Sequence, residues 1–160
     1  MSHIGVFCPN VPGHLNPMVA LADAIRTRGH RVTFFLLGVP PSSIAEAGFE
    51  IVPLGGSVFP VEQYHAELEK LGSLQGRAAL THTLAIGARA AAAILEVGPA
   101  VVRAAGVTAL VIDQASFPAG TVADQLRLPF ATVCNALLLN PDSAVPPYCT
   151  HWQPRDTWWA

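Results

Sequence analysis

The strongest constraint on the fold is a regular alternation of short apolar segments with longer helical ones. Segments rich in β-branched and aromatic residues recur along the chain, and helical periodicity follows most of them. This alternation is typical of a parallel sheet whose strands are joined by right-handed crossover helices. It predicts a doubly wound, three-layer α/β domain of the Rossmann-like class.

Strands are expected at residues 3–9, 31–37, 49–54, 109–113 and 129–136. Helices are expected at residues 17–27, 41–47, 61–71, 75–96 and 117–126. In the first helix Pro17 suits the first turn, Asn16 is the candidate N-cap, and Gly29 suits a left-handed position after the C-terminal end. Pro99 is expected to break the long alanine-rich helix before a last turn to Ala105. The expected strand order is the common 3-2-1-4-5 arrangement.

Length and composition limit the remaining possibilities. The 160 residues suit one domain, which we place at residues 1–140, followed by a Pro- and Trp-rich segment at residues 141–160. Charged residues make up 12% of the chain against about 25% in a typical domain, so we expect something apolar to cover part of the surface. Scattered Lys and Arg residues and a net charge of −2 argue against nucleic-acid binding.

The cysteines and the apolar segments indicate the cellular compartment of the protein. Cys8, Cys134 and Cys149 are an odd number without Cys-x-x-Cys spacing, and two of them lie in expected buried strands. This usage favours reduced core thiols and a cytoplasmic location. No signal peptide is visible, and charged residues interrupt the alanine-rich segment, so we do not expect it to span a membrane.

Candidate chemistry lies in the loops beyond the carboxyl ends of the strands, where open α/β sheets bind ligands. The first such loop contains Gly13, which permits close backbone approach, and His14, whose residue type suits a general base. Asp113 ends the fourth strand beside the first, so its carboxylate can reach the His14 ring and fix its tautomer. Because Gly-x-Ser-x-Gly does not occur, the deprotonated hydroxyl would belong to a substrate. The alternative is a simple turn with a solvated or capped histidine.

The remaining candidates carry less specific chemistry. No metal site is expected, because the other histidines lack metal-ligand spacing and more often serve in cores or on surfaces. These are His3, His30, His65 and His82. Phe59 and Phe117 are candidates for lining an apolar ligand channel, although core packing or contact with a further domain is the commoner role.

The same residues carry a resemblance to a known family. Residues 13–18 (Gly-His-Leu-Asn-Pro-Met) and 28–33 (Arg-Gly-His-Arg-Val-Thr) resemble the opening of family 1 glycosyltransferases, the UDP-sugar-dependent enzymes of the two-domain GT-B fold. The likeness is strongest to bacterial carotenoid (zeaxanthin) glucosyltransferases. It continues through residues 110–114, 128–136, 146–148 and 158–159. It covers essentially the whole chain but only the N-terminal, acceptor-binding half of such an enzyme.

The resemblance implies a catalytic arrangement. The family's histidine, here His14, deprotonates the acceptor hydroxyl, and its aspartate, here Asp113, orients the histidine. Asn135 and Gly13 match positions that contact the donor sugar, and Phe59 and Phe117 would line the acceptor site. The donor is a nucleotide sugar such as UDP-glucose, the reaction inverts the anomeric configuration, and no metal or other cofactor is generally needed. The acceptor would be an apolar hydroxylated small molecule, such as a carotenoid or another natural product.

The resemblance also implies a partner. The nucleotide-sugar site of this family lies mainly in a C-terminal domain, and no glycine-rich phosphate motif replaces it in this sequence. We therefore expect the isolated chain to be inactive without a C-terminal nucleotide-sugar-binding domain. Three alternatives remain open: a non-catalytic subunit of a split glycosyltransferase, a module that binds an apolar ligand, and an α/β domain with no site at these residues. Peripheral membrane contact also remains open.

Overall fold

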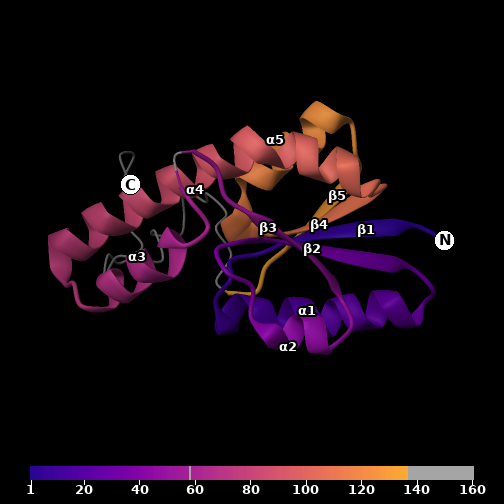
Figure 1. The fold of residues 1–160 in the computed structure, drawn as a ribbon, viewed down its shortest axis with the longest axis horizontal. Coiled ribbons are helices and arrows are strands. Elements are labelled where there is room, and N and C mark those ends of the chain that lie inside the picture. The colour runs from indigo at the N-terminus through magenta and orange to yellow at the C-terminus, as the bar shows by residue number, and fades with distance from the viewer. Residues whose placement is uncertain (58, 137–160) are drawn as a thin grey trace, which may run out of the picture.

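The structure, a computed structural model that describes residues 1–57 and 59–136, is built on one parallel sheet. Its strands run in the order β3-β2-β1-β4-β5 (Figure 1). They are β1 (His3–Phe7), β2 (Arg31–Leu37), β3 (Glu50–Leu54), β4 (Ala109–Asp113) and β5 (Phe130–Val133). The expected fold class and strand order are confirmed. The Pro- and Trp-rich segment, with Cys149, lies outside the described residues.

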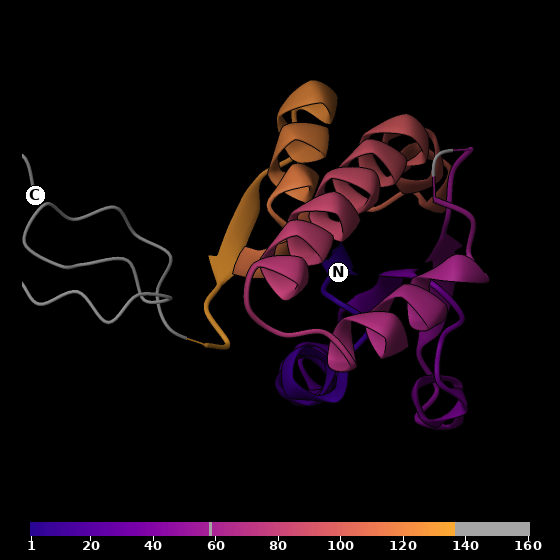
Figure 2. The same cartoon turned by 90° about the vertical axis from the view of Figure 1, so that its left-hand side faces the viewer.

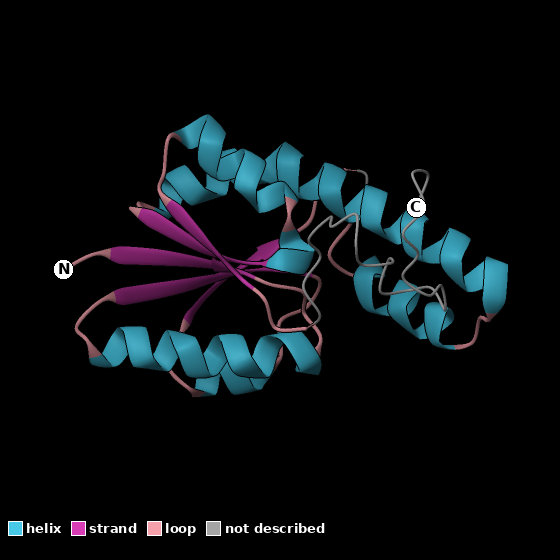
Figure 3. Ribbon diagram, turned by 180° about the vertical axis from the view of Figure 1, so that it is seen from behind, coloured by secondary structure: helices cyan, strands magenta, loops and turns pink. Residues whose placement is uncertain are grey.

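Helices cover both faces of this sheet and make three layers (Figures 1 and 2). On one face lie α1 (Pro12–Thr27) and α2 (Ser42–Glu46). On the other face lie the long α4 (Gly76–Ala105) and α5 (Pro118–Leu126), which contact each other. Helix α3 (Gln63–Gly72) packs against the N-terminal half of α4, and this pair extends beyond the carboxyl edge of the sheet (Figure 3).

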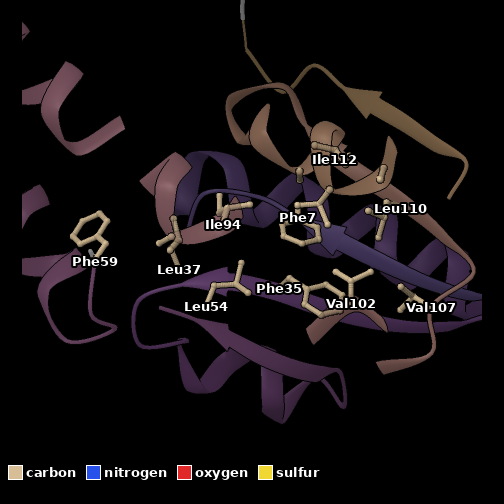
Figure 4. Close-up of a cluster of buried hydrophobic side chains, with 14 of the residues drawn as sticks. Phe7, Phe35, Leu37, Leu54, Phe59, Ile94, Val102, Val107, Leu110 and Ile112 are labelled. Atoms are coloured by element: carbon tan, nitrogen blue, oxygen red, sulfur yellow. The ribbon is translucent and has the colours of Figure 1, made fainter. Parts of the chain in front are cut away.

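The hydrophobic core lies on both faces of the sheet. Phe34 and Leu36 of β2 face α1, whereas Phe35 and Leu37 face α4, as the two-residue period of a strand requires. On the α4 side the ring of Phe7 stacks on Phe35, with 4.9 Å between ring centroids (Figure 4). Strand β2 is buried along nearly its whole length, as expected for an inner strand of a parallel sheet.

Helix α1 begins earlier than the sequence pattern predicted. It starts at Pro12, with Val11 as an N-cap residue that provides no side-chain cap, so the predicted cap at Asn16 is wrong. Pro12 suits the first helical position because its φ is fixed and its missing N–H would be unpaired there. Pro17 is tolerated inside the helix at the loss of one hydrogen bond, the one to the Gly13 carbonyl. As a consequence His14 lies in the first turn of a helix rather than in a loop. Gly29 has a φ of +85°, as expected after the helix end.

Helix α4 continues through Pro99, so the predicted break is wrong. The proline leaves the carbonyl of Leu95 without its helical donor, but Leu95 is exposed and water can satisfy that group. The helix is held there by packing: Gly98 lies against Val122 of α5 so closely that an added Cβ would come within 3.1 Å of it. The helix ends at Gly106, whose φ of +67° is a left-handed cap.

Strand β5 is shorter than predicted, and this changes the environment of one cysteine. Cys134 lies beyond the strand end and is exposed, so the prediction of a buried thiol there is wrong. Cys8 is buried as predicted, and burial raises the pKa of its thiol to about 12. Neither cysteine forms a disulfide.

Helix α4 also bears on membrane contact. It is long and apolar enough to cross a bilayer, and 28% of its most apolar window is buried in the domain. No other helix within residues 1–57 and 59–136 meets that test. The contacts of α4 with α3, α5 and β3 favour a helix of the folded domain over a spanning segment.

Candidate active site at the carboxyl edge of the sheet

The structure brings His14 and Asp113 into direct contact. His14 is the third residue of α1, Asp113 is the last residue of β4, and β4 pairs with β1, from which α1 follows. Nδ1 of His14 lies 2.8 Å from Oδ2 of Asp113. The carboxylate is fully buried, whereas 25% of the His14 side chain is exposed.

This geometry defines what the imidazole can do. An ionised carboxylate can only accept hydrogen bonds, so Nδ1 of His14 carries the proton and Nε2 holds a free lone pair in the neutral ring. The carboxylate also stabilises the positive charge that the ring gains when Nε2 takes up a proton. The pair is therefore suited to removing a proton from a hydroxyl group beside Nε2.

Asp113 is held by two further donors. The backbone N–H of Ala115 donates to Oδ1 over 2.8 Å, and the side-chain amide of Asn135 donates to Oδ2 over 2.7 Å. A buried carboxylate needs such partners, because removing the charge from water is costly. Asn135, which the resemblance assigns to the donor sugar, thus lies in contact with the carboxylate that holds His14.

Gly13 lies beside this pair at the second position of α1. A Cβ built at Gly13 would meet no atom within 4 Å, so the backbone faces open space. The φ of Gly13 is not in the left-handed region, and the helix itself therefore does not require glycine there. Open space next to the general-base candidate is the kind of room that a second substrate needs.

An apolar cavity of about 210 Å³ lies near the pair, beside the turn that follows Asp113. Its floor is formed by side chains of the inner strands, and its walls come from α3, α4 and the turn that follows Asp113. The lining includes Phe7, Leu37, Tyr64, Ile86, Ile94 and Phe117. Ala115, whose N–H binds Asp113, also lines it, whereas His14 and Asp113 themselves do not, so one residue separates the cavity from the polar pair.

The two predicted channel aromatics differ in position. Phe117 lines the cavity and is 69% exposed, so it lies at the opening. Phe59 does not line it, and its ring is buried in the hydrophobic cluster on the α4 side (Figure 4). The ring lies under the Arg89 guanidinium at 4.4 Å and contacts Tyr64. The contacts of Phe59 are therefore those of core packing, which the sequence analysis gave as the commoner role.

Sequence reasoning missed the contribution of α4 to the cavity. Thr83, Gly87 and Ala91 recur every four residues and line it with their small side chains. The spacing is visible in the sequence, but spacing alone does not distinguish a cavity wall from a face that packs against another helix. Asp113 itself lines a second, open hollow of about 820 Å³, together with residues of β5 and α5.

The other histidines take part in structural contacts. His3 bonds to Thr33 over 2.8 Å, His65 to the Val39 carbonyl over 3.0 Å, and His82 lies 3.2 Å from the Glu67 carboxylate. Glu67 also binds Arg89, and that hydrogen bond holds the pKa of the Glu67 carboxyl below its usual value. Within the described part of the chain no three His, Cys, Asp or Glu side chains lie close enough together to hold a metal ion.

Comparison with known proteins adds a direct relative. The chain is 30% identical over 147 residues to a zeaxanthin glucosyltransferase of Pseudescherichia vulneris. The resemblance to glycosyltransferases is confirmed. The match takes in 91% of this chain but 34% of that glucosyltransferase, so the chain spans about a third of the length of this relative. No family model matches the chain.

Solved glycosyltransferases share the fold. The Streptomyces sp. SF2575 glycosyltransferase SsfS6 superimposes with a TM-score of 0.63 at 19% identity, over 82% of this chain and 39% of its own. The calicheamicin glycosyltransferase CalG4 superimposes with a TM-score of 0.65 at 21% identity, over 82% of this chain and 32% of its own. The α/β Rossmann-like domain is therefore the one found in GT-B glycosyltransferases.

Proposed function

We propose that this chain is the acceptor-binding part of an inverting glycosyltransferase. The reaction would move a hexose from a nucleotide sugar to a hydroxyl of an apolar small molecule. One observation carries the proposal: the bond of 2.8 Å between His14 and the buried Asp113, beside an apolar cavity. The likeness to a glucosyltransferase supports the same reaction class.

In this mechanism His14 acts on the acceptor. Nε2 removes the proton of the acceptor hydroxyl as its oxygen attacks the anomeric carbon of the sugar. The new C–O bond forms while the bond to the nucleotide diphosphate breaks, so the configuration at that carbon inverts. Asp113 stabilises the imidazolium that results. General-base assistance of this kind contributes about 10²–10⁴-fold to the rate.

The cavity sets the class of acceptor. Its lining is almost entirely apolar, and Tyr64 and Phe117 give it aromatic faces. Its volume of about 210 Å³ lies below the range of about 300–1,000 Å³ that encloses a whole drug-sized ligand. It therefore suits one hydroxylated ring of a longer molecule, such as an end of a carotenoid, with the rest of the acceptor outside.

The donor would bind mainly to a further domain. Among solved structures with this fold, the glycosyltransferase SsfS6 is complexed with thymidine diphosphate and TcCGT1 is in complex with UDP. We propose UDP-glucose or a similar nucleotide sugar as the donor and a C-terminal nucleotide-sugar-binding domain as the partner. Alone, the 160-residue chain would then bind acceptor but transfer no sugar. The proposed compartment is the cytoplasm, where the free thiols of Cys8 and Cys134 stay reduced.

A binding subunit is the second candidate. The exposed aromatic side chains of Phe117 (69%) and Phe130 (43%) lie around the open hollow next to Asp113, and such exposed apolar groups often mark a contact surface. In that case the chain would dock a separate donor-side protein or sequester an apolar ligand without turnover.

The deciding experiment combines the chain with a donor domain. That domain is either one encoded with this chain in its own gene or the one of the P. vulneris glucosyltransferase. Transfer from UDP-glucose to zeaxanthin is measured by mass spectrometry, and zeaxanthin binding by fluorescence quenching. We expect His14→Ala to lower transfer by about 10²–10⁴-fold while binding changes little. Binding without any His14-dependent transfer would favour the binding subunit.

A further inference from the structure

Asn135 is bonded to the same carboxylate oxygen that holds His14. Oδ2 of Asp113 accepts from Nδ1 of His14 at 2.8 Å and from Nδ2 of Asn135 at 2.7 Å. Oδ1 accepts from the N–H of Ala115 at 2.8 Å. Each oxygen of this fully buried carboxylate thus has at least one fixed donor.

We propose that Asn135 is a positioning residue, whose amide fixes the carboxylate of Asp113 and so keeps His14 in the tautomer with a free Nε2. This inference rests on the proposed function only where it treats that free Nε2 as the base. It differs from the resemblance, which assigns Asn135 to the donor sugar.

Strand pairing explains why Asn135 reaches this place. Asp113 pairs with Val133 in the register of β4 and β5, and Asn135 follows two residues later. The register brings the end of β5 beside the end of β4, and the path of the two residues after Val133 places the amide at the carboxylate. His14 approaches the same oxygen from α1, so three segments far apart in sequence converge on one carboxylate.

The physical effect follows from the way a carboxylate rotates. The two oxygens share one carbon, so rotation about the Cβ–Cγ bond moves both of them. Without Asn135, only the Ala115 N–H at Oδ1 and His14 itself at Oδ2 oppose that rotation. The Asn135 amide is a further donor at Oδ2 and restricts this rotation, because a hydrogen bond to an ionised group is stronger than one between neutral groups. The Nδ1–H bond of His14 is then preorganised before any substrate arrives.

The first test needs no sugar transfer. The tautomer of His14 and the solvent exchange of its Nδ1 proton are measured by two-bond ¹H–¹⁵N correlation NMR on the full 160-residue chain. The variant is Asn135→Leu, which matches the amide in size but donates no hydrogen bond. We expect the Nδ1–H tautomer to lose population and its proton to exchange about tenfold faster, since tenfold corresponds to about 1.4 kcal/mol.

A matched control separates this effect from general loosening. Asn16→Leu makes the same change at an exposed site on α1, two residues from His14, and should leave the tautomer and the exchange rate unchanged. An Asn135→Leu chain that keeps the wild-type tautomer and exchange rate overturns the proposal. If that variant were poorly folded, Asn135→Ala, which introduces no bulk, would be measured in its place.

The second test separates positioning from donor contact in the chain combined with a donor domain. Positioning predicts that Asn135→Leu lowers kcat about tenfold or more with little change in the KM for UDP-glucose. A raised donor KM with normal kcat and a normal His14 tautomer would assign Asn135 to the donor sugar instead. If transfer is absent in every form but the NMR effect is seen, the proposed function fails and the positioning role stands.

Discussion

The two ends of the sheet each hold a histidine beside a carboxylate, and they differ in which partner is buried. At the carboxyl edge Asp113 is fully buried, and the His14 ring reaches open space. At the amino edge the order is reversed: His3 is buried and bonds to Thr33, whereas the Glu50 side chain is 58% exposed. A buried carboxylate with an accessible ring is suited to general-base chemistry, while a buried ring with a solvated carboxylate is suited to a structural contact.

Isosteric substitutions of the two carboxylates give the largest expected contrast. In the proposed mechanism Asp113→Asn removes the charge that would stabilise the His14 imidazolium, so we expect kcat of the chain combined with a donor domain to fall by about 10²–10⁴-fold. Glu50→Gln is the matched change at the other end, and kcat should stay within about twofold because Glu50 lies far from the cavity along the strands. Steady-state transfer assays compare them. If both substitutions lowered kcat equally, the different burial of the two carboxylates would have no bearing on activity.

The next effect concerns the acceptor and the apolar wall. Gly87→Leu places a large side chain on the face of α4 that lines the cavity, where a Cβ meets nothing within 4 Å. We expect the KM for a bulky apolar acceptor to rise about tenfold, because the leucine side chain fills the pocket and the acceptor loses its apolar contacts there. Ala88→Leu, one residue further along α4 and exposed, is the control and should leave that KM unchanged. A smaller phenolic acceptor should be affected less by Gly87→Leu than the bulky one; an equal rise for both would argue against acceptor binding in this cavity.

Gly13 tests whether the open space beside His14 is used by a substrate. Gly13→Ala should raise the free energy of unfolding by about 0.5–1 kcal/mol, because alanine favours the helix and the added methyl group meets no atom. If the donor sugar passes over Gly13, the same methyl group should lower transfer by about tenfold. Thermal unfolding and transfer assays on one preparation measure both. A variant that is more stable and fully active would show that the donor sugar does not contact Gly13.

The fold was predictable because its signals are local. Strands β2 and β4 have the predicted bounds, since each is a continuous apolar segment whose ends are clear in the sequence. The start of α1 was misplaced because Pro12 and Pro17 both suit a first helical turn. The continuation of α4 through Pro99 depends on the packing of Gly98 against Val122, a tertiary contact that no local pattern reveals.

The candidate site was only partly predictable, for a related reason. The contact of His14 with Asp113 follows once the strand order is known, because β1 and β4 are neighbours whose carboxyl ends meet. The bond from Asn135 to Asp113 depends on the path of the chain just after β5, which the sequence does not define. The small residues of α4 have the same spacing whether they pack against a helix or border a cavity.

The smallest expected effect is a pH dependence of stability that belongs to the amino edge. Burial, and then the nearby Arg31 charge, lower the pKa of His3, so the folded chain favours the neutral ring. Below the ordinary histidine pKa of about 6.5 the unfolded chain gains this proton first, and the folded state loses stability as pH falls toward the lower folded pKa. His3→Gln keeps a donor for Thr33 but does not titrate, so its free energy of unfolding should fall less than that of the wild type between about pH 7 and pH 5. Denaturant unfolding at several pH values measures the difference. If the free energy of unfolding changed equally with pH in the two proteins, His3 would have the same pKa in the folded and unfolded chain. The contrast between the two ends of the sheet would then not hold.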